Sequence, residues 1–191
     1  MKTLQKTLQE TYKIPTAYLS LDDLYLTNKD QKTLAKSHPN NPLIQHRGQP
    51  GTHDLQLAKQ VFSSLKHSQL THLPRYDKSR FGGEGDRVDL SDWPVVNTGG
   101  KNDDTIKLVI FEGWCVGFRP YKSDQSLYSQ WIAAVNAKDQ SLSGEEISTP
   151  PYNGRLGFVH FDDIKVVNDS LKDYDGLTEL VYPISPIFIH C

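Results

Sequence analysis

The chain contains little sulfur: two cysteines, Cys115 and Cys191, and one methionine in 191 residues. So few cysteines, so far apart, form neither the disulfide framework of a small secreted domain nor a four-ligand zinc site. The seven histidines are scattered, and none forms the closely spaced pair beside a carboxylate that marks a helical zinc site. We therefore expect free thiols and no dedicated transition-metal site.

Long apolar runs and an excess of one charge are also absent. No stretch approaches the roughly 20 apolar residues that a membrane helix needs, and the N-terminal segment MKTLQKTLQETYK has no signal-peptide core. Lys and Arg number 21 against 23 Asp and Glu, and the net charge of -2 gives no electrostatic footprint for DNA or anionic lipid. The sequence predicts a soluble, cytoplasmic protein that binds neither nucleic acid nor membrane, and no pattern indicates its oligomeric state.

What is present is the composition of one globular domain, with 37% hydrophobic and 23% charged residues. Leu4 and Leu8 lie at helical spacing and predict a helix over residues 1–13. The segments TAYLSL (residues 16–21) and IKLVIF (residues 106–111) predict strands, the second apolar on both faces as in the centre of a parallel sheet.

Between these strands, the sequence predicts loops and one good helix. Residues 27–54 predict a long loop with about one helical turn near residues 29–36, and Asp54 predicts the N-cap of a helix that runs to Leu65. Residues 74–87 predict an irregular segment. Further helices are expected around residues 127–135 and 162–174, and the C-terminal segment PISPIFIHC is apolar and typical of a strand.

Carboxylates follow both predicted strands: Asp22 and Asp23 after the first, Glu112 after the second. In open α/β sheets, ligands bind at the carboxyl ends of the strands. An enzyme that phosphorylates a hydroxyl needs one carboxylate to accept the proton and another to hold magnesium, so this placement suits a kinase. The alternative is that an aspartate caps the following turn and Glu112 is a surface acid.

Two loops carry cations beside glycines. RGQPGTHD places Arg47 near His53 and Asp54, and PRYDKSRFGGEGDR carries Lys78 and Arg87 around a glycine-rich stretch. Glycine lets the backbone approach a ligand, and Arg47 can clamp an anion. These loops indicate an anionic or polyhydroxylated ligand; the alternatives are a solvated turn before the Asp54 cap and a merely flexible loop.

In this order, the segments SLDDLYLT, RGQPGTHD, PRYDKSRFGGEGDR and VIFEGWCVGF resemble the P-loop kinases related to D-glycerate 3-kinase and its fungal ATP-binding homologues. That family is similar to pantothenate kinase, uridine kinase and phosphoribulokinase. The resemblance covers residues 16–118 and implies an α/β fold with a doubly wound parallel sheet of the P-loop NTPase type, ATP and Mg²⁺ as cofactors, and a small hydroxylated acceptor.

The resemblance also implies residue roles. Asp22 or Asp23 would position or deprotonate the acceptor hydroxyl, and Glu112 would be the carboxylate near magnesium, acting through a water molecule. Six further positions match motif residues on the acceptor side: Arg47, His53, Asp54, Tyr76, Lys78 and Arg87.

The sequence departs from that family in one essential motif. It contains no G-x-x-x-x-G-K-[ST], whose backbone and lysine hold the phosphates and whose hydroxyl binds magnesium. We therefore expect residues 1–191 to form a single partial kinase-like domain without the Walker A strand and loop and without the C-terminal lid region, unable to transfer phosphate alone. The alternative hypothesis is a non-catalytic ligand-binding or regulatory protein, and Cys115 as a hydrolase nucleophile has no identifiable base.

Overall fold

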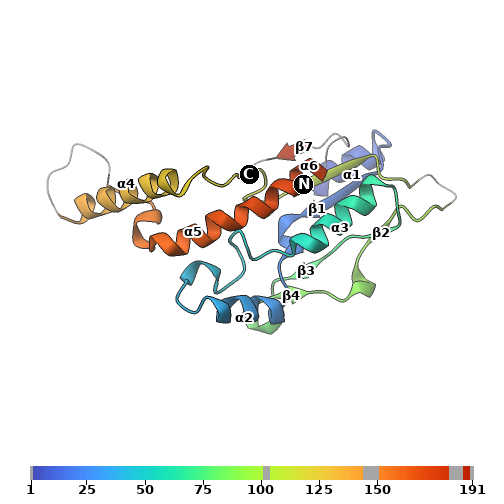
Figure 1. The fold of residues 1–191 in the computed structure, drawn as a ribbon. Coiled ribbons are helices and arrows are strands. Elements are labelled where there is room, and N and C mark those ends of the chain that lie inside the picture. Colours follow the sequence, from blue (N-terminus) through green and yellow to red (C-terminus); the bar gives the residue numbers. More distant parts are fainter. Residues whose placement is uncertain (1, 101–103, 144–150, 181–186, 190–191) are drawn as a thin grey trace.

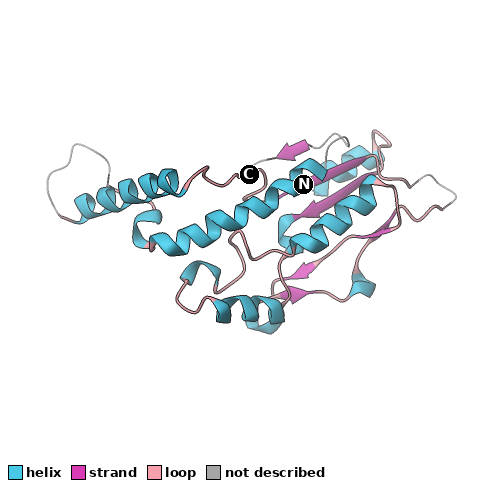
Figure 2. Cartoon of the chain, in the orientation of Figure 1, coloured by secondary structure: helices cyan, strands magenta, loops and turns pink. Residues whose placement is uncertain are grey.

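The computed structural model describes residues 2–100, 104–143, 151–180 and 187–189. Figures 1 and 2 show the arrangement of its helices and strands. In chain order these are α1 (Lys2–Glu10), β1 (Thr16–Ser20), α2 (Asn28–Ser37), α3 (Leu55–Lys66), β2 (Thr71–His72), β3 (Tyr76–Asp77), β4 (Asp86–Arg87), β5 (Val95–Val96), β6 (Leu108–Glu112), α4 (Asp124–Leu142), α5 (Phe161–Ser170), α6 (Asp175–Leu180) and β7 (Ile187–Ile189).

The main sheet is parallel, with strand order β1-β6-β7. β1 and β6 pair in register from Thr16 opposite Leu108 to Ser20 opposite Glu112. Their carboxyl ends therefore meet at one edge of the sheet. This arrangement confirms the predicted α/β class with a parallel sheet, and it adds two short antiparallel pairs, β2 with β5 and β3 with β4.

The core lies between this sheet and α3. Because successive strand residues face opposite sides, β1 buries Ala17 and Leu19 on one face, and the Phe111 ring of β6 meets Phe62 of α3 edge to face at 5.0 Å. Burying each large apolar side chain contributes about 1.5–3 kcal/mol. Asp54 caps α3 by accepting a hydrogen bond from the Leu57 amide at 2.9 Å, as the sequence predicted.

The connection from β1 to α3 is more ordered than the sequence predicted. Instead of one helical turn, residues 28–37 form the complete helix α2, because the Thr27 side chain caps the Asp30 amide. Residues 74–87, predicted to be irregular, contain the β3–β4 pair with the 3₁₀ helix η3 (Arg80–Gly83) between its strands. The cap of α2 is local, but the Asn28 amide at its start also donates to Asp86 at 2.9 Å, and β3 and β4 form only by pairing with each other, so local patterns missed both.

In Figure 1, α4 lies away from the sheet, and α5 leads back from it toward α6, which lies against α3. α4 contains the predicted segment 127–135, whereas the predicted segment 162–174 is covered by α5 and then by the 3₁₀ helix η6 (Leu171–Tyr174). Trp131 of α4 packs near Phe161 of α5 with ring centroids 5.7 Å apart. Within the parts of the chain that the structure describes, no helix combines the length and apolarity needed to cross a membrane.

The predicted C-terminal strand contains β7, but residues 181–186 and 190–191, including Cys191, lie outside the described residues.

Candidate acceptor site at the carboxyl ends of the strands

The site begins where β1 turns into the short 3₁₀ helix η1 (Leu21–Leu24). The Ser20 hydroxyl accepts a hydrogen bond from the Asp22 amide at 3.2 Å and starts this turn. The turn presents Asp22 and Asp23 at the same sheet edge as Glu112, which pairs with Ser20 in the β1–β6 register. The three predicted carboxylates thus end their strands at one edge, as parallel pairing requires.

Glu112 is held by a side chain from the neighbouring strand. The Tyr18 hydroxyl donates to Glu112 Oε1 at 2.7 Å. Burial, together with the hydrogen bond to Glu112 and its negative charge, raises the pKa of Tyr18 to about 12. Tyr18 therefore stays protonated and orients the Glu112 carboxylate.

Asp23 serves as an anchor for the chain that precedes the β3–β4 turn. Its carboxylate accepts hydrogen bonds from Arg75 Nη1 at 3.1 Å and from the Tyr76 amide at 3.2 Å. Burial raises the pKa of Asp23, against the opposing effect of the Arg75 charge. A carboxylate engaged on both oxygens is poorly placed to accept a proton from a ligand.

Asp22, in contrast to Asp23, pairs with a lysine side chain at the surface. Its Oδ2 pairs with Lys78 Nζ at 2.5 Å. Burial alone would raise the pKa of Asp22, but hydrogen bonds from Lys78 and Tyr25 and the Lys78 charge outweigh it and lower the pKa. Of the two aspartates, Asp22 has the more exposed side chain, 38% against 15% for Asp23.

Two cavities flank this ion pair. The first, called here the Asp22 cavity, has a volume of about 600 Å³ and is lined by Lys2, Tyr18, Ser20, Asp22, Asp23, Arg75, Tyr76, Asp77, Lys78 and Val88. The second, called here the Arg47 cavity, has a volume of about 550 Å³ and is lined by Tyr25, His46, Arg47, Lys78, Gly82, Gly83 and Glu84. Lys78 lines both, so its ammonium stands at their boundary.

Arg47 is fixed from two sides. Its guanidinium donates to the backbone carbonyls of Gly83 (2.8 Å) and Glu84 and lies 5.7 Å from the Tyr76 ring centroid. Gly85 lets this packing form: its φ is +80°, and a Cβ there would stand 2.6 Å from the Tyr76 ring. None of these contacts neutralises the Arg47 charge.

His53 lies beneath the site rather than in it. The residue is 5% exposed, and its ring stacks on Tyr25 with centroids 4.6 Å apart and places Nδ1 2.6 Å from the Tyr174 hydroxyl. That hydroxyl also accepts a hydrogen bond from the Gly51 amide at 3.0 Å. Burial lowers the pKa of His53 to about 4.

Asp54 and Arg87 are engaged with each other. Arg87 Nη2 donates to Asp54 Oδ2 at 2.9 Å and to the Tyr25 carbonyl at 3.1 Å, while the other Asp54 oxygen caps α3. Neither residue lines the two cavities. The structure therefore brings Asp22, Arg47, Tyr76 and Lys78 together around the cavities and places Asp54, Arg87 and His53 in their support.

Several residues of this site were not predicted. Tyr25 and Arg75 lie inside the segments SLDDLYLT and PRYDKSRFGGEGDR, so these motifs could have indicated both. Tyr174 comes from the distant 3₁₀ helix η6 (Leu171–Tyr174), and no sequence signal connects it to His53. Cys115 is buried, and burial raises the pKa of its thiol to about 11, which disfavours the thiolate that a nucleophile requires.

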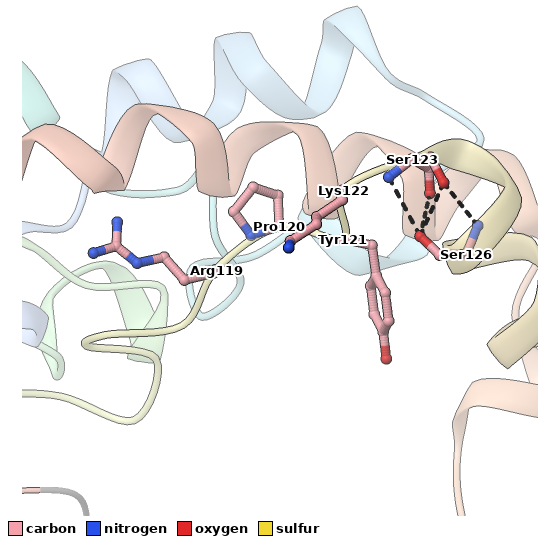
Figure 3. A pocket seen from close by; sticks show the side chains of 6 residues that line it. All are labelled: Arg119, Pro120, Tyr121, Lys122, Ser123 and Ser126. Carbon is pink, nitrogen blue, oxygen red and sulfur yellow. Dashed lines mark hydrogen bonds between the residues drawn. The ribbon is translucent and has the colours of Figure 1, made fainter.

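A further cavity of about 470 Å³ lies at the start of α4, away from the predicted residues (Figure 3). Its lining includes Ser123 and Ser126, which hydrogen-bond each other and their backbone amides in a capping box. This local role accounts for the positions of both serines.

No family model matches the chain. The uncharacterized kinase mug58 of Schizosaccharomyces pombe is 51% identical over 106 residues, 54% of this chain and 36% of that protein. The chloroplastic D-glycerate 3-kinase of Arabidopsis thaliana is 39% identical over 121 residues, 61% of this chain and 25% of that protein. The solved structure of D-glycerate 3-kinase from Cryptococcus neoformans matches with a TM-score of 0.72 at 34% identity and covers 94% of this chain and 56% of that chain.

These matches have two consequences. They confirm the kind of fold that the sequence predicted, a mixed α/β fold with a parallel sheet like that of the solved structure. The chain also spans only part of each relative, 36% and 25% of the two curated proteins and 56% of the solved chain.

Proposed function

Since this chain is a homologue of D-glycerate 3-kinases and of fungal kinases related to them, we propose that its two cavities form the acceptor site of an ATP-dependent small-molecule kinase. The acceptor is a small hydroxylated anion, with D-glycerate the compound that the relatives' names suggest. The single observation that carries this proposal is the ionised Asp22 at the sheet edge, between cavities lined by Arg47 and Lys78.

In this proposal Asp22 is the general base. It accepts the proton of the acceptor hydroxyl through Oδ, and the hydroxyl oxygen becomes the nucleophile. Its lowered pKa keeps it ionised at neutral pH. Asp23, held by Arg75 and the Tyr76 amide, fixes the position of the segment that carries Lys78 rather than taking the proton itself.

The acceptor carboxylate binds in the Arg47 cavity. A guanidinium presents two parallel donors to a carboxylate, and Lys78 adds a point charge at the boundary with Asp22. Tyr76 supports Arg47 through its ring. The buried groups His53, Asp54 and Arg87 hold the two loops against each other from below.

Mg²⁺ fits this edge only as a weakly held ion. Among the residues that the structure describes, no three ligating side chains cluster, but Mg²⁺ keeps several waters and uses one or two carboxylates together with substrate phosphates. Glu112, oriented by Tyr18, is suited to hold one of those waters. Mg²⁺ supplies charge neutralisation for the transferred phosphoryl group.

The 191-residue sequence contains no G-x-x-x-x-G-K-[ST] motif, so it lacks the residues that would hold the phosphates of ATP. We assign no step to ATP within these residues. The same observation favours a second candidate function, a non-catalytic protein that binds the acceptor without phosphorylating it.

We expect the purified 191-residue chain to bind D-glycerate and to form no ADP from ATP and Mg²⁺ in its presence. Isothermal titration calorimetry should give a dissociation constant at or below about 1 mM, the upper end of common KM values, and glycerol, which lacks the carboxylate, should give no heat. A coupled ADP assay measures turnover on the same sample, after circular dichroism has verified its fold.

The two readouts separate the proposals. Absence of D-glycerate binding by the folded chain contradicts the acceptor site. Robust ADP formation contradicts the expectation that residues 1–191 cannot transfer phosphate alone.

A further inference from the structure

Lys78 is the one cation shared by the two cavities. Its ammonium lies 2.5 Å from Asp22 Oδ2, and the two side chains are 56% and 38% exposed. An ion pair this exposed is weak, because water screens the charges and the long lysine side chain loses entropy when held. The pair can therefore be exchanged at small cost.

The Arg47 cavity offers an anion more positive charge than negative charge. Besides Lys78, its lining includes the cation Arg47, and its carboxylate Glu84 is already engaged by Lys32 at 2.8 Å and by Asn28 at 3.0 Å. Arg47 itself is tied to backbone carbonyls and cannot turn far. Lys78, on a flexible four-carbon stem, is the cation that can move toward an incoming anion.

We propose that a carboxylate bound in the Arg47 cavity draws the Lys78 ammonium away from Asp22 and so releases Asp22 to accept the hydroxyl of the same ligand. This exchange rests on the proposed function and deepens it, because Asp22 becomes free to act as the base only when the carboxylate of the ligand is bound. A neutral polyol leaves the Lys78–Asp22 pair intact. Lys78 thus acts on the reaction as a positioning residue as well as a binding one.

The exchange has a chemical purpose. While Lys78 holds Asp22, its hydrogen bond and charge favour the ionised form and make Asp22 a poor proton acceptor. Once Lys78 leaves, burial and the neighbouring Asp23 charge act on Asp22 with Tyr25 as its remaining donor, and its basicity rises. The base is then strongest when an acceptor is present.

Affinity measurements on the full 191-residue chain test this exchange with D-glycerate as the probe. Asp22→Asn removes the competitor for Lys78 and should tighten D-glycerate binding about two- to fivefold, the range that the loss of an exposed ion pair implies. Asp77→Asn is the matched control, because Asp77 lines the same cavity and carries the same charge but pairs with Arg80. It should change the affinity less than about 1.5-fold, within the scatter of exposed pairs.

Two further variants complete the cycle. Lys78→Met should weaken D-glycerate binding about tenfold, as expected for the loss of one charge-assisted contact. In Lys78→Met, adding Asp22→Asn should give no further tightening. Independently, the carboxyl ¹³C resonance of Asp22 should move when D-glycerate is added to the unmodified chain and stay in place when glycerol is added.

Several outcomes overturn the exchange. If Asp22→Asn and Asp77→Asn tighten binding equally, the gain is general electrostatics. If Asp22→Asn weakens D-glycerate binding, Lys78 stays paired with Asp22 in the complex. The same conclusion follows if D-glycerate binds but the Asp22 carboxyl resonance does not move. These results leave the acceptor site standing, whereas no D-glycerate binding by the unmodified chain overturns the proposed function together with the exchange.

Discussion

Replacing Arg47 with methionine will weaken D-glycerate binding about 10- to 100-fold, the effect expected when hydrogen bonds to a charged group are lost. Methionine keeps much of the side-chain volume over the Tyr76 ring but removes the charge and the paired donors. Lysine at the same position keeps the charge without the fork, so Arg47→Lys should fall between the two. Isothermal titration calorimetry with D-glycerate measures all three proteins.

The matched control for Arg47 is Arg80→Met. Arg80 lies in the glycine-rich turn whose carbonyls Arg47 contacts, but it pairs with Asp77 at 3.8 Å and donates to the Arg87 carbonyl at 3.0 Å, and it lines neither cavity. Its removal should change D-glycerate affinity less than about twofold, as exposed ion pairs do. Equal losses in Arg47→Met and Arg80→Met would mean that the turn matters only as structure and that Arg47 does not hold the carboxylate.

Acidification will destabilise the fold through His53. In the unfolded chain the histidine has a pKa near 6.5, and in the folded chain burial lowers the pKa to about 4. Between these values the unfolded state binds more protons, so stability is full above about pH 6.5 and falls as the pH drops toward 4. The shift corresponds to about 3 kcal/mol of unfolding free energy lost across this window.

Urea unfolding at a series of pH values measures this loss. His53→Gln should lower stability at pH 7, because it disturbs the packing against Tyr25 and the bond to Tyr174, and should flatten the slope between pH 6.5 and 4. His67→Gln, at an exposed position that ends α3, should keep the slope of the unmodified chain. Parallel slopes in the unmodified chain and His53→Gln would show that another group governs the acid loss.

The sequence predicted best what depends on neighbours along the chain. The capped helix after Asp54 and the strands that contain Leu19 and Phe111 were correct because apolar spacing and cap residues are local signals. The parallel pairing followed from an apolar run followed by carboxylates. The edge that gathers Asp22 and Glu112 was therefore predictable.

The supporting contacts could not be predicted in the same way. Tyr174 meets His53 across 121 positions of sequence, and Arg87 reaches Asp54 across 33. Such pairs exist only after the loops and the C-terminal helices have packed. For the same reason the sequence grouped Asp54 and Arg87 with the ligand-facing residues, although the structure engages them with each other.

From the sequence, Lys78 could be predicted only to be a cation in a loop. Its position between two cavities, with Asp22 as partner, needs the turn at β3–β4 to bring Lys78 back to the strand edge. The distinction between Asp22 and Asp23, neighbours in sequence, likewise arises from what each contacts. Environment, rather than residue type, separates the proposed base from the anchor.

The most direct measurement is a crystal structure of the 191-residue chain with D-glycerate. The account predicts the ligand carboxylate within hydrogen-bond distance of Arg47 and Lys78, and a ligand hydroxyl on Asp22, with Lys78 no longer on that aspartate. A ligand bound without contact to Arg47, or with its hydroxyls turned away from Asp22, would contradict the acceptor site proposed for this sheet edge.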